Sequence, residues 1–253
     1  MKVLITGAGA RVGRAIALEF AKKGYDLALH YHQNQKGAQA TLEDVNQLNP
    51  RSNSSISFCV SADLSTPQGC QSLMNEVEKR WGDLDVLINN ASLFSPQPFE
   101  SISDEMWHKM LHVNVTAPFM LSRDLLPLLK KGKLNRQPSH RRASIIHICD
   151  IGADRPLKGY THYAVSKAAL QMLVKSMAIE LAPQIACVGV SPGQVAWPPF
   201  FDEVSKEKLT RRIPMQRSGE PLDIATLVRH LVLEAPYING AIIPVDGGLA
   251  CRY

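Results

Sequence analysis

The chain lacks the cysteine pattern of a disulfide-rich or zinc-binding protein. Its 253 residues include five cysteines, an odd number, and none belongs to a Cys-x-x-Cys pair. No apolar run approaches ~18 residues, so we expect no membrane span. The first residues, MKVLITGAG, form a strand and a glycine turn at once, which leaves no room for a signal peptide. These absences favour a cytoplasmic location.

The charge balance is mildly basic, with a formal net charge of +5. Such a balance suits an anionic partner, either a phosphorylated cofactor or a nucleic acid, and it also occurs on surfaces that bind nothing. The basic stretch KGKLNRQPSHRRA at 131–143 contains no aromatic residue that could stack on a base. We therefore interpret it as a solvated loop and expect no nucleic-acid partner.

Short β-branched runs alternate with helical stretches, without a low-complexity linker or an internal repeat. We expect strands at 2–6, 25–32, 55–63, 84–92, 142–150, 185–193 and 240–248. We expect helices at 11–24, 36–50, 66–82, 104–130, 160–182 and 221–235. Several strands are nearly all apolar, as two-sided burial requires. The predicted fold class is α/β: a doubly wound parallel sheet of about seven strands with helices on both faces, in one domain spanning 1–253.

The first predicted strand leads into a glycine-rich turn, LITGAGARVGRAIA. Glycine at Gly7, Gly9 and Gly13 permits a tight turn and a close approach of the backbone to a pyrophosphate, which the next helix can bind with its N-terminal N–H groups. A glycine triplet alone is a weak signal, but its place after the first strand favours a dinucleotide site over a simple turn. Arg11 stands where a third glycine is expected. Its side chain either points toward the phosphates, or toward whatever binds beyond them, or it is an ordinary surface charge at the start of a helix.

The second strand lacks the acid that selects NAD. An NAD enzyme usually carries Asp or Glu there to bind the ribose 2′-hydroxyl, but no carboxylate occurs in residues 27–37. The polar residues available instead for a 2′-phosphate are His30, His32, Gln33, Asn34 and Lys36. They could also be ordinary loop residues. The missing acid is the firmer part of the argument, and it favours NADP(H) over NAD.

Tyr163 and Lys167 are spaced to share one face of the predicted helix 160–182. An ammonium near a phenol stabilises the phenolate and lowers a tyrosine pKa that starts near ~10. The pair could therefore act as an acid/base at neutral pH. Such a pair can also merely pack a helix, but the glycine turn and the acid-free second strand favour the catalytic interpretation.

Six motifs in this order resemble those of the short-chain dehydrogenases/reductases, a family with a Rossmann-type fold: TGAGARVG at 6–13, NNAS at 89–92, HVN at 112–114, YAVSK at 163–167, SPG at 191–193 and PVDGG at 244–248. The resemblance implies that Tyr163 donates the proton, Lys167 binds the nicotinamide ribose, and Asn114 holds a water that links the lysine to solvent. It also implies that Asp63 contacts the adenine. The cofactor contacts implied in full are Thr6, Gly7, Arg11, Val12, Gly13, His30, Tyr31, His32, Gln33, Asn34, Asp63, Leu64, Asn90, Ala91, Ser92, Tyr163, Lys167, Pro192 and Gly193.

The chain departs from most of the family at Asp150. A serine usually stands thirteen positions before the tyrosine and hydrogen-bonds a substrate carbonyl, but here position 150 is aspartate. Neither Cys149 nor Ile151 can replace that serine, and the nearest upstream serine is Ser144. An ionised carboxylate accepts hydrogen bonds and cannot donate one to a ketone oxygen. The exchange therefore argues against ordinary ketone or β-ketoacyl reduction.

A substrate with N–H donors, or with a ring nitrogen that must gain a proton, would suit an acid at this position. The chain resembles the pteridine-reductase branch of the family, in which Asp, Tyr and Lys form the catalytic set and Arg replaces glycine in the turn. LHYH at 29–32 and NNASLF at 89–94 match that branch, although Gln33 and Asn34 replace its usual Arg-Ser. The substrate contacts implied are Arg11, Ser92, Phe94, Asp150, Tyr163 and Trp197, the last within a predicted substrate lid at 194–215.

The function expected from this combination is NADPH-dependent reduction of a dihydropterin or of dihydrofolate, with Asp150, Tyr163, Lys167 and Asn114 as the catalytic residues. One alternative is a carbonyl or 3-oxoacyl-[acyl-carrier-protein] reductase of the same fold, and another is a non-catalytic NADP-binding sensor. The intact Tyr163, Lys167 and Asn114 speak against a sensor, which needs no proton path. The resemblance also implies a homotetramer or dimer, formed through the long helices at 103–130 and 160–182, and it implies no metal.

Overall fold

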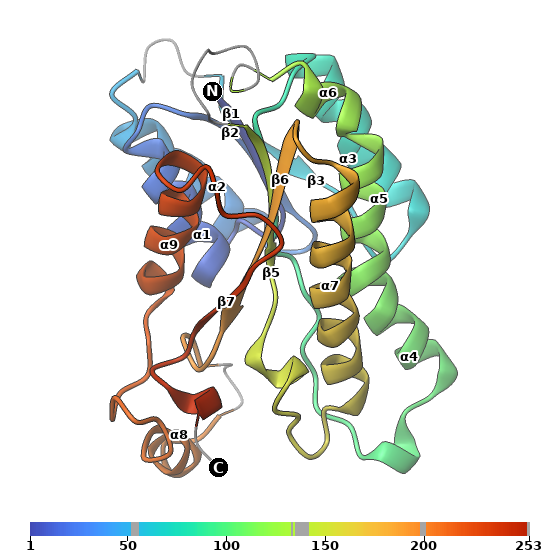
Figure 1. Ribbon diagram of the computed structural model, residues 1–253, viewed down its shortest axis with the longest axis vertical. Helices are drawn as coiled ribbons and strands as arrows, with labels where there is room; N and C mark the ends of the chain where they lie inside the picture. The colour runs from blue at the N-terminus through green and yellow to red at the C-terminus, as the bar shows by residue number, and fades with distance from the viewer. Residues whose placement is uncertain (52–55, 133, 135–141, 198–200, 252–253) are drawn as a thin grey trace.

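A single parallel sheet organises the chain in the computed structural model, which describes residues 1–51, 56–132, 134, 142–197 and 201–251. The order of its seven strands is β3-β2-β1-β4-β5-β6-β7 (Figure 1). All six strand pairings are parallel. The strands are β1 (Lys2–Ile5), β2 (Asp26–Tyr31), β3 (Phe58–Ser61), β4 (Val86–Asn89), β5 (Ala143–Ile148), β6 (Ile185–Pro192) and β7 (Ile242–Val245).

Helices cover both faces of this sheet and create two apolar cores. The helices α1 (Arg11–Ala21), α2 (Gln35–Leu48) and α9 (Pro221–Leu233) bury one face, in a core around Phe20, Ile88 and Val228. The other face packs against α3 (Pro67–Trp81), α5 (Ala117–Asp124), α6 (Leu126–Lys130) and α7 (Thr161–Glu180). The predicted fold, a doubly wound parallel sheet with helices on both faces, is confirmed.

The strand order reverses direction between β1 and β4. After β1 the chain moves outward through β2 and β3, and it then returns to place β4 on the other side of β1. The two crossover connections therefore diverge at the carboxyl ends of β1 and β4, where open α/β sheets bind their ligands. Two short helices lie toward this end of the sheet, α4 (Asp104–Leu111) and α8 (Glu203–Thr210) (Figure 1).

The predicted long helix at 104–130 is interrupted. It consists of α4, a π-helical turn η3 (His112–Thr116), α5 and α6. Pro118 explains the change of register, because a proline has no N–H to donate to the carbonyl of Asn114 four residues earlier. In the wider turn, Ala117 donates its N–H to the carbonyl of His112. Turns of this kind are frequent at functional sites, and this one contains Asn114.

Other elements agree with the sequence apart from their ends. Helix α8 was not expected as a helix within the predicted lid at 194–215. Of the predicted loop at 131–143, residues 133 and 135–141 lie outside the described residues. Among the helices described, none is both long and apolar enough to cross a membrane.

His30 links three strands at their carboxyl ends. Its Nδ1 accepts a hydrogen bond of 3.2 Å from the N–H of Gly7, and its Nε2 lies 3.1 Å from the carbonyl oxygen of Ala62. These two contacts assign the neutral tautomer with its hydrogen on Nε2. Burial lowers the pKa of His30 to about 4, because a charged imidazole would lose its hydration. The side chain is therefore a neutral connector between the glycine turn, β2 and β3.

A second neutral histidine lies on β5. His147 on β5 is fully buried, and its Nδ1 lies 3.4 Å from Nδ2 of Asn89 on β4. The same amide group donates to Oγ of Ser122 on α5 at 3.3 Å. Burial lowers the pKa of His147 to about 3, and the nearby Lys167 adds to this effect. Two imidazoles of the core therefore remain uncharged at neutral pH.

We predict that acid destabilises this fold through His30 and His147. Both groups have folded-state pKa values below the unfolded value near ~6.5, so the unfolded chain binds more protons as the pH falls. Their contribution to stability is complete above that unfolded pKa and is lost as the pH falls toward the folded values. Between pH 7 and pH 5 each histidine should cost about 2 kcal/mol.

Chemical denaturation measured across this pH range tests the prediction. The variant His30→Asn should be less stable at neutral pH but should lose less stability on acidification than the parent chain. His108, on the exposed surface of α4, supplies the control variant His108→Asn, which should keep the full pH dependence. Equal losses in all three proteins would show that other groups cause the acid sensitivity.

Candidate active site

Most of the site residues predicted from the sequence lie where parallel strands end. Thr6 and the glycine turn follow β1, Asp63 and Leu64 follow β3, and Asn90, Ala91 and Ser92 follow β4. Asp150 follows β5, and Pro192 and Gly193 close and follow β6. Tyr163 and Lys167 come from α7, and Asn114 comes from η3. The fold thus brings segments distant in sequence to one edge of the sheet.

The Thr6 hydroxyl joins the two strands at the reversal point. Its Oγ1 accepts hydrogen bonds from the backbone N–H groups of Asn90 at 2.9 Å and Ala91 at 3.0 Å. The Asn90 side chain returns the contact, donating to the carbonyl oxygens of Thr6 at 2.8 Å and Gly7 at 3.1 Å. These bonds hold the glycine turn against the end of β4, so the NNAS motif fixes the shape of the turn.

The glycine turn leaves an uncapped helix end. Gly7 has a φ of +67°, and a Cβ on Gly13 would lie 2.2 Å from the carbonyl oxygen of Gly7, so both positions require glycine. Side chains cap the N-termini of α2, α3, α4 and α8, but Ala10 gives α1 no such bond and its first turn has no acid. Free N–H groups and a positive dipole at this end suit the pyrophosphate of a dinucleotide.

Two residues expected to bind the 2′-phosphate have structural roles instead. Both ring nitrogens of His30 are engaged within the fold, so its imidazole cannot serve as a phosphate ligand. Asn34 caps α2, accepting from the N–H of Gly37 at 3.1 Å and donating to the carbonyl of Gly9 at 3.0 Å. A polar residue near a turn can satisfy the backbone as readily as a ligand, and a contact of these two residues with a cofactor stays a prediction.

The remaining side chains of that loop are accessible. His32 is half exposed, with Nε2 3.8 Å from Oδ2 of Asp63. The pKa of Asp63 is lowered chiefly by a hydrogen bond from the N–H of Ser65. Gln33 and Lys36 are exposed, and Tyr31 is partly buried at the end of β2. The cationic and polar groups that remain for a 2′-phosphate are therefore His32, Gln33 and Lys36.

Asp150 and Tyr163 meet directly. The tyrosine hydroxyl donates a 2.7 Å hydrogen bond to Oδ2 of Asp150, and the N–H of Gly152 donates a 2.6 Å bond to Oδ1. Asp150 thereby caps the 3₁₀ turn η5 (Ile151–Ala153) and fixes its own orientation toward α7. A loop separates these two residues in the sequence, but their side chains form one hydrogen-bonded pair.

Burial controls the protonation of this pair. It raises the pKa of Asp150, although hydrogen bonds from Tyr163 and Gly152 and the charge of Lys167 oppose the shift. Burial, and then the charge of Asp150, raises the pKa of Tyr163 well above its ordinary value. The sequence predicted a lowered tyrosine pKa, and the opposite holds because burial, and then the charge of the neighbouring carboxylate, disfavours the phenolate. The tyrosine is therefore a phenol, poised to donate.

Lys167 is held away from the tyrosine hydroxyl. Its Nζ donates a 2.9 Å hydrogen bond to the carbonyl of Ile148 and lies 5.7 Å from the centre of the Tyr163 ring. Burial lowers the pKa of Lys167, which the charge of Asp150 partly counteracts. One carbonyl satisfies only one of the three ammonium hydrogens, so the others remain to bind hydroxyl groups of a ligand.

Asn114 is completely enclosed by hydrogen bonds. Its Oδ1 accepts from the N–H of Leu93 at 2.8 Å and from Oγ of Ser92 at 3.1 Å. Its Nδ2 donates to the carbonyl of Leu93 at 3.1 Å and to Oγ of Ser166 at 2.9 Å. The side chain therefore joins the segment after β4 to α7. Ser166 was not identified from the sequence, although it lies inside the YAVSK motif.

An aromatic cluster adjoins the catalytic pair. Phe94 stacks on Tyr160 with ring centroids 4.7 Å apart and an angle of 19°, and it meets Tyr163 edge to face at 4.8 Å. Met110 packs against the same group. Tyr160, three residues before Tyr163, is a second residue that the sequence did not reveal. It covers one side of the ring that we expect to contact substrate.

Arg11 bridges the glycine turn to the predicted lid. It has a φ of +50°, unusual for a non-glycine residue, and its Nη2 donates a 2.8 Å bond to the carbonyl of Ala196. The adjacent Trp197 contacts Phe201, with ring centroids 5.5 Å apart. The third aromatic residue of this segment, Phe200, lies outside the described residues. The positive charge of Arg11 acts to lower the pKa of Tyr163, which places the guanidinium near the pair.

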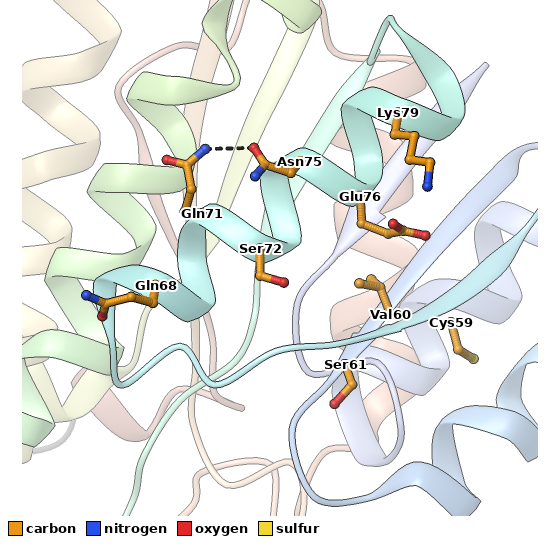
Figure 2. Close-up of a pocket in the computed structure, with 9 residues that line it drawn as sticks. All are labelled: Cys59, Val60, Ser61, Gln68, Gln71, Ser72, Asn75, Glu76 and Lys79. Carbon is orange, nitrogen blue, oxygen red and sulfur yellow. Dashed lines mark hydrogen bonds between the residues drawn. The ribbon is translucent and has the colours of Figure 1, made fainter.

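A separate groove of about 620 Å³ lies between β3 and α3 (Figure 2). Its lining includes Ser61, Gln68, Gln71, Asn75 and Lys79. None of the predicted site residues belongs to this lining. The described residues contain no group of three or more His, Cys, Asp or Glu side chains able to hold a metal ion.

Comparison with known proteins agrees with this geometry. A family model described as enoyl-(acyl carrier protein) reductase matches residues 7–250. Glucose 1-dehydrogenase 2 of Bacillus subtilis is 30% identical, over 97% of this chain and 93% of its own length. Pteridine reductase 1 of Leishmania tarentolae is also 30% identical, over 97% and 94%. The 3-oxoacyl-[acyl-carrier-protein] reductase of Staphylococcus aureus is 29% identical, over 97% and 96%.

These matches span nearly the whole chain and include the glycine turn, the Asn114 turn and the Tyr163–Lys167 helix. Members of the group generally bind NAD(P)(H), act on small molecules and often oligomerise. The relatives differ in the substrate that their names specify, so the likeness establishes the kind of enzyme and not the substrate. The chain belongs to the short-chain dehydrogenase/reductase family of oxidoreductases.

Proposed function

We propose that this enzyme is an NADPH-dependent pterin reductase that converts a dihydropterin, or dihydrofolate, to the tetrahydro form. The observation that carries the proposal is the hydrogen bond from Tyr163 to Asp150, at the position where most of the family has a serine. The carboxyl group receives a second bond from the N–H of Gly152. A carboxylate held in this way can accept further hydrogen bonds but, while ionised, cannot donate one to a ketone oxygen.

A pterin supplies the groups that this pair requires. Its amino and ring N–H groups are donors for the lone pairs of Asp150 that remain free, and its reducible C=N bond ends in a nitrogen that must gain a proton. NADPH, when bound, supplies the hydride for the carbon of that bond. Tyr163 gives its proton to the nitrogen, its hydrogen bond to Asp150 orients the phenol for that transfer, and solvent returns the proton afterwards.

The cofactor side of the proposal rests on the uncapped end of α1 and on the loop after β2. Thr6, Gly7 and the N-terminal turn of α1 would bind the pyrophosphate, and Lys167 would bind the nicotinamide ribose. His32, Gln33 and Lys36 would contact the 2′-phosphate, and no carboxylate from 27 to 37 repels it. The similarity to a relative named pteridine reductase supports the same assignment, as does the position of Phe94 beside Tyr163.

We predict that the purified enzyme oxidises NADPH when given a dihydropterin and leaves a β-ketoacyl thioester unreduced. NADPH should also bind more tightly than NADH, because the loop after β2 offers cations and no acid to the 2′-phosphate. Absorbance at the reduced-nicotinamide band, with dihydrobiopterin, dihydrofolate and the thioester in parallel, measures the first point. Fluorescence titration with both cofactors measures the second. Faster reduction of the thioester would assign the enzyme to the alternative carbonyl chemistry.

We predict that Asp150→Ser lowers dihydropterin turnover about thirtyfold or more, equivalent to ~2 kcal/mol in the barrier. The serine removes both the charged acceptor for the pterin N–H groups and the carboxylate that orients the Tyr163 hydroxyl. NADPH affinity should change little, because the glycine turn is intact. Asp154→Ser is a matched control: Asp154 is exposed and accepts a bond from Gln171, away from Tyr163. Unchanged turnover in Asp150→Ser would remove the aspartate from the mechanism.

We also propose that the enzyme assembles through α7, as a dimer or a tetramer. Val165, Met172 and Ile179 recur every seven residues on this helix and are 42%, 60% and 81% exposed. Phe119 on α5, at 42%, adds to the exposed apolar surface of this layer of helices. An apolar stripe of this length on an isolated chain favours a partner, and a second copy is the simplest one.

The prediction is that light scattering at micromolar concentration gives the mass of a dimer or tetramer. Replacing both Met172 and Ile179 with Glu should shift the mass toward that of one chain, because two buried charges would face each other across the interface. Val204→Glu, at an exposed apolar residue on α8, is the control and should leave the mass unchanged. A monomeric parent enzyme would contradict this assembly.

A further inference from the structure

We propose that Ser166 is a positioning residue that locks the Asn114 turn to the catalytic helix. The inference rests on the proposed catalytic roles of Tyr163, Lys167 and Asn114, and it adds a residue to which the motifs assign no role. Ser166 is fully buried and lies on α7 between the tyrosine and the lysine. Two hydrogen bonds at its hydroxyl carry the argument.

The first bond runs along the helix. Oγ of Ser166 donates to the carbonyl oxygen of Tyr163 at 2.6 Å, the local bond to a preceding carbonyl that serine often makes inside helices. A hydroxyl has one hydrogen, so this bond uses its only donor and leaves the oxygen lone pairs as acceptors. The orientation of the Ser166 hydroxyl is thus set by the backbone of Tyr163, the residue that donates the proton in the proposed reaction.

The second bond runs between elements. Nδ2 of Asn114 donates to Oγ of Ser166 at 2.9 Å and to the carbonyl of Leu93 at 3.1 Å. Its other neighbour is Sδ of Met110 at 3.2 Å, and a thioether sulfur is a weak acceptor. Without the serine, one amide hydrogen of a fully enclosed side chain would have only that sulfur as an acceptor.

The two bonds place the serine in a chain from Leu93 through Asn114 and Ser166 to Tyr163. The π-helical turn η3 is the element that this chain has to hold, since Pro118 denies the Asn114 carbonyl its usual helical donor. Among the described residues, the bond from Asn114 to Ser166 is the one hydrogen bond that joins a side chain of η3 to a side chain of α7. Ser166 therefore fixes the distance between the Asn114 turn and the pair Tyr163–Lys167.

The decisive variant is Ser166→Ala, compared with Ser122→Ala. Ser122 is equally buried, on α5, and its Oγ accepts a bond from Asn89, not from a residue of the site. Both variants lose a buried hydroxyl, so both should lower the melting temperature. Only Ser166→Ala should speed hydrogen–deuterium exchange in the peptide covering 112–116, a readout that needs neither cofactor nor substrate.

The catalytic readout uses whichever substrate the parent enzyme reduces. Ser166→Ala should lower kcat about tenfold, change NADPH affinity less than about twofold and move the pH at which kcat is half-maximal. Ser122→Ala should leave the pH profile where it was. In an Asn114→Ala background, removing Ser166 should have little further effect on the profile, because the serine acts through Asn114.

These outcomes separate the inference from the proposed function. If dihydropterins are not substrates, the exchange data and the pH profile with another substrate still test Ser166. Equal exchange at 112–116 in the two serine variants, or an unchanged pH profile in Ser166→Ala, would reduce Ser166 to a packing residue and overturn the inference.

Discussion

The pairing of β1 with β4 is the constraint on which the site depends. Every other strand adds outward from these two, and the order reverses where they meet. Thr6 closes the junction by accepting the N–H groups of Asn90 and Ala91, while Asn90 holds the carbonyls of the glycine turn. A turn held in this way has little freedom to relax. The uncapped end of α1 is therefore preorganised before any phosphate arrives, and the entropy of ordering it is lost during folding rather than during binding.

Most polar groups around the edge serve the fold and the site at once. His30, Asn34 and Asn114 each connect two or more elements with side-chain hydrogen bonds, and all three could be taken from sequence as ligands. Asn114 combines the structural role with the role in the site. Its carboxamide is fully hydrogen-bonded within the fold, so only the backbone of its turn is left to contact a solvent molecule. His30 and Asn34 likewise use their side chains to bind backbone groups of the fold. A polar residue next to parallel strand ends must satisfy orphan backbone groups before it can bind anything else.

The sequence predicts the architecture well because its signals are local. Apolar runs, glycine at 7 and 13, and the spacing of Tyr163 and Lys167 depend on periodicity and backbone geometry, and each appears where expected. What the sequence could not predict depends on contacts between distant segments. The break at η3 has a local signal in Pro118, but the bond from Asn114 to Ser166 joins residues 52 apart. The direction of the Tyr163 pKa required knowing that the phenol is buried and that its hydroxyl donates to Asp150.

That last comparison determines what chemistry the pair can perform. An ammonium beside the hydroxyl would favour phenolate and a base, but Nζ of Lys167 is bound to the Ile148 carbonyl, and Asp150 receives the phenol hydrogen instead. Burial raises the pKa of both partners, so a proton is retained between them at neutral pH. A largely buried pair that holds a proton can act as an acid, and an acid is what a reduction needs once hydride has reached the carbon. With serine at 150 the tyrosine would lose this charged acceptor, because a serine hydroxyl is neutral and can also donate, and the charge of Lys167 would no longer be opposed by a carboxylate beside the phenol.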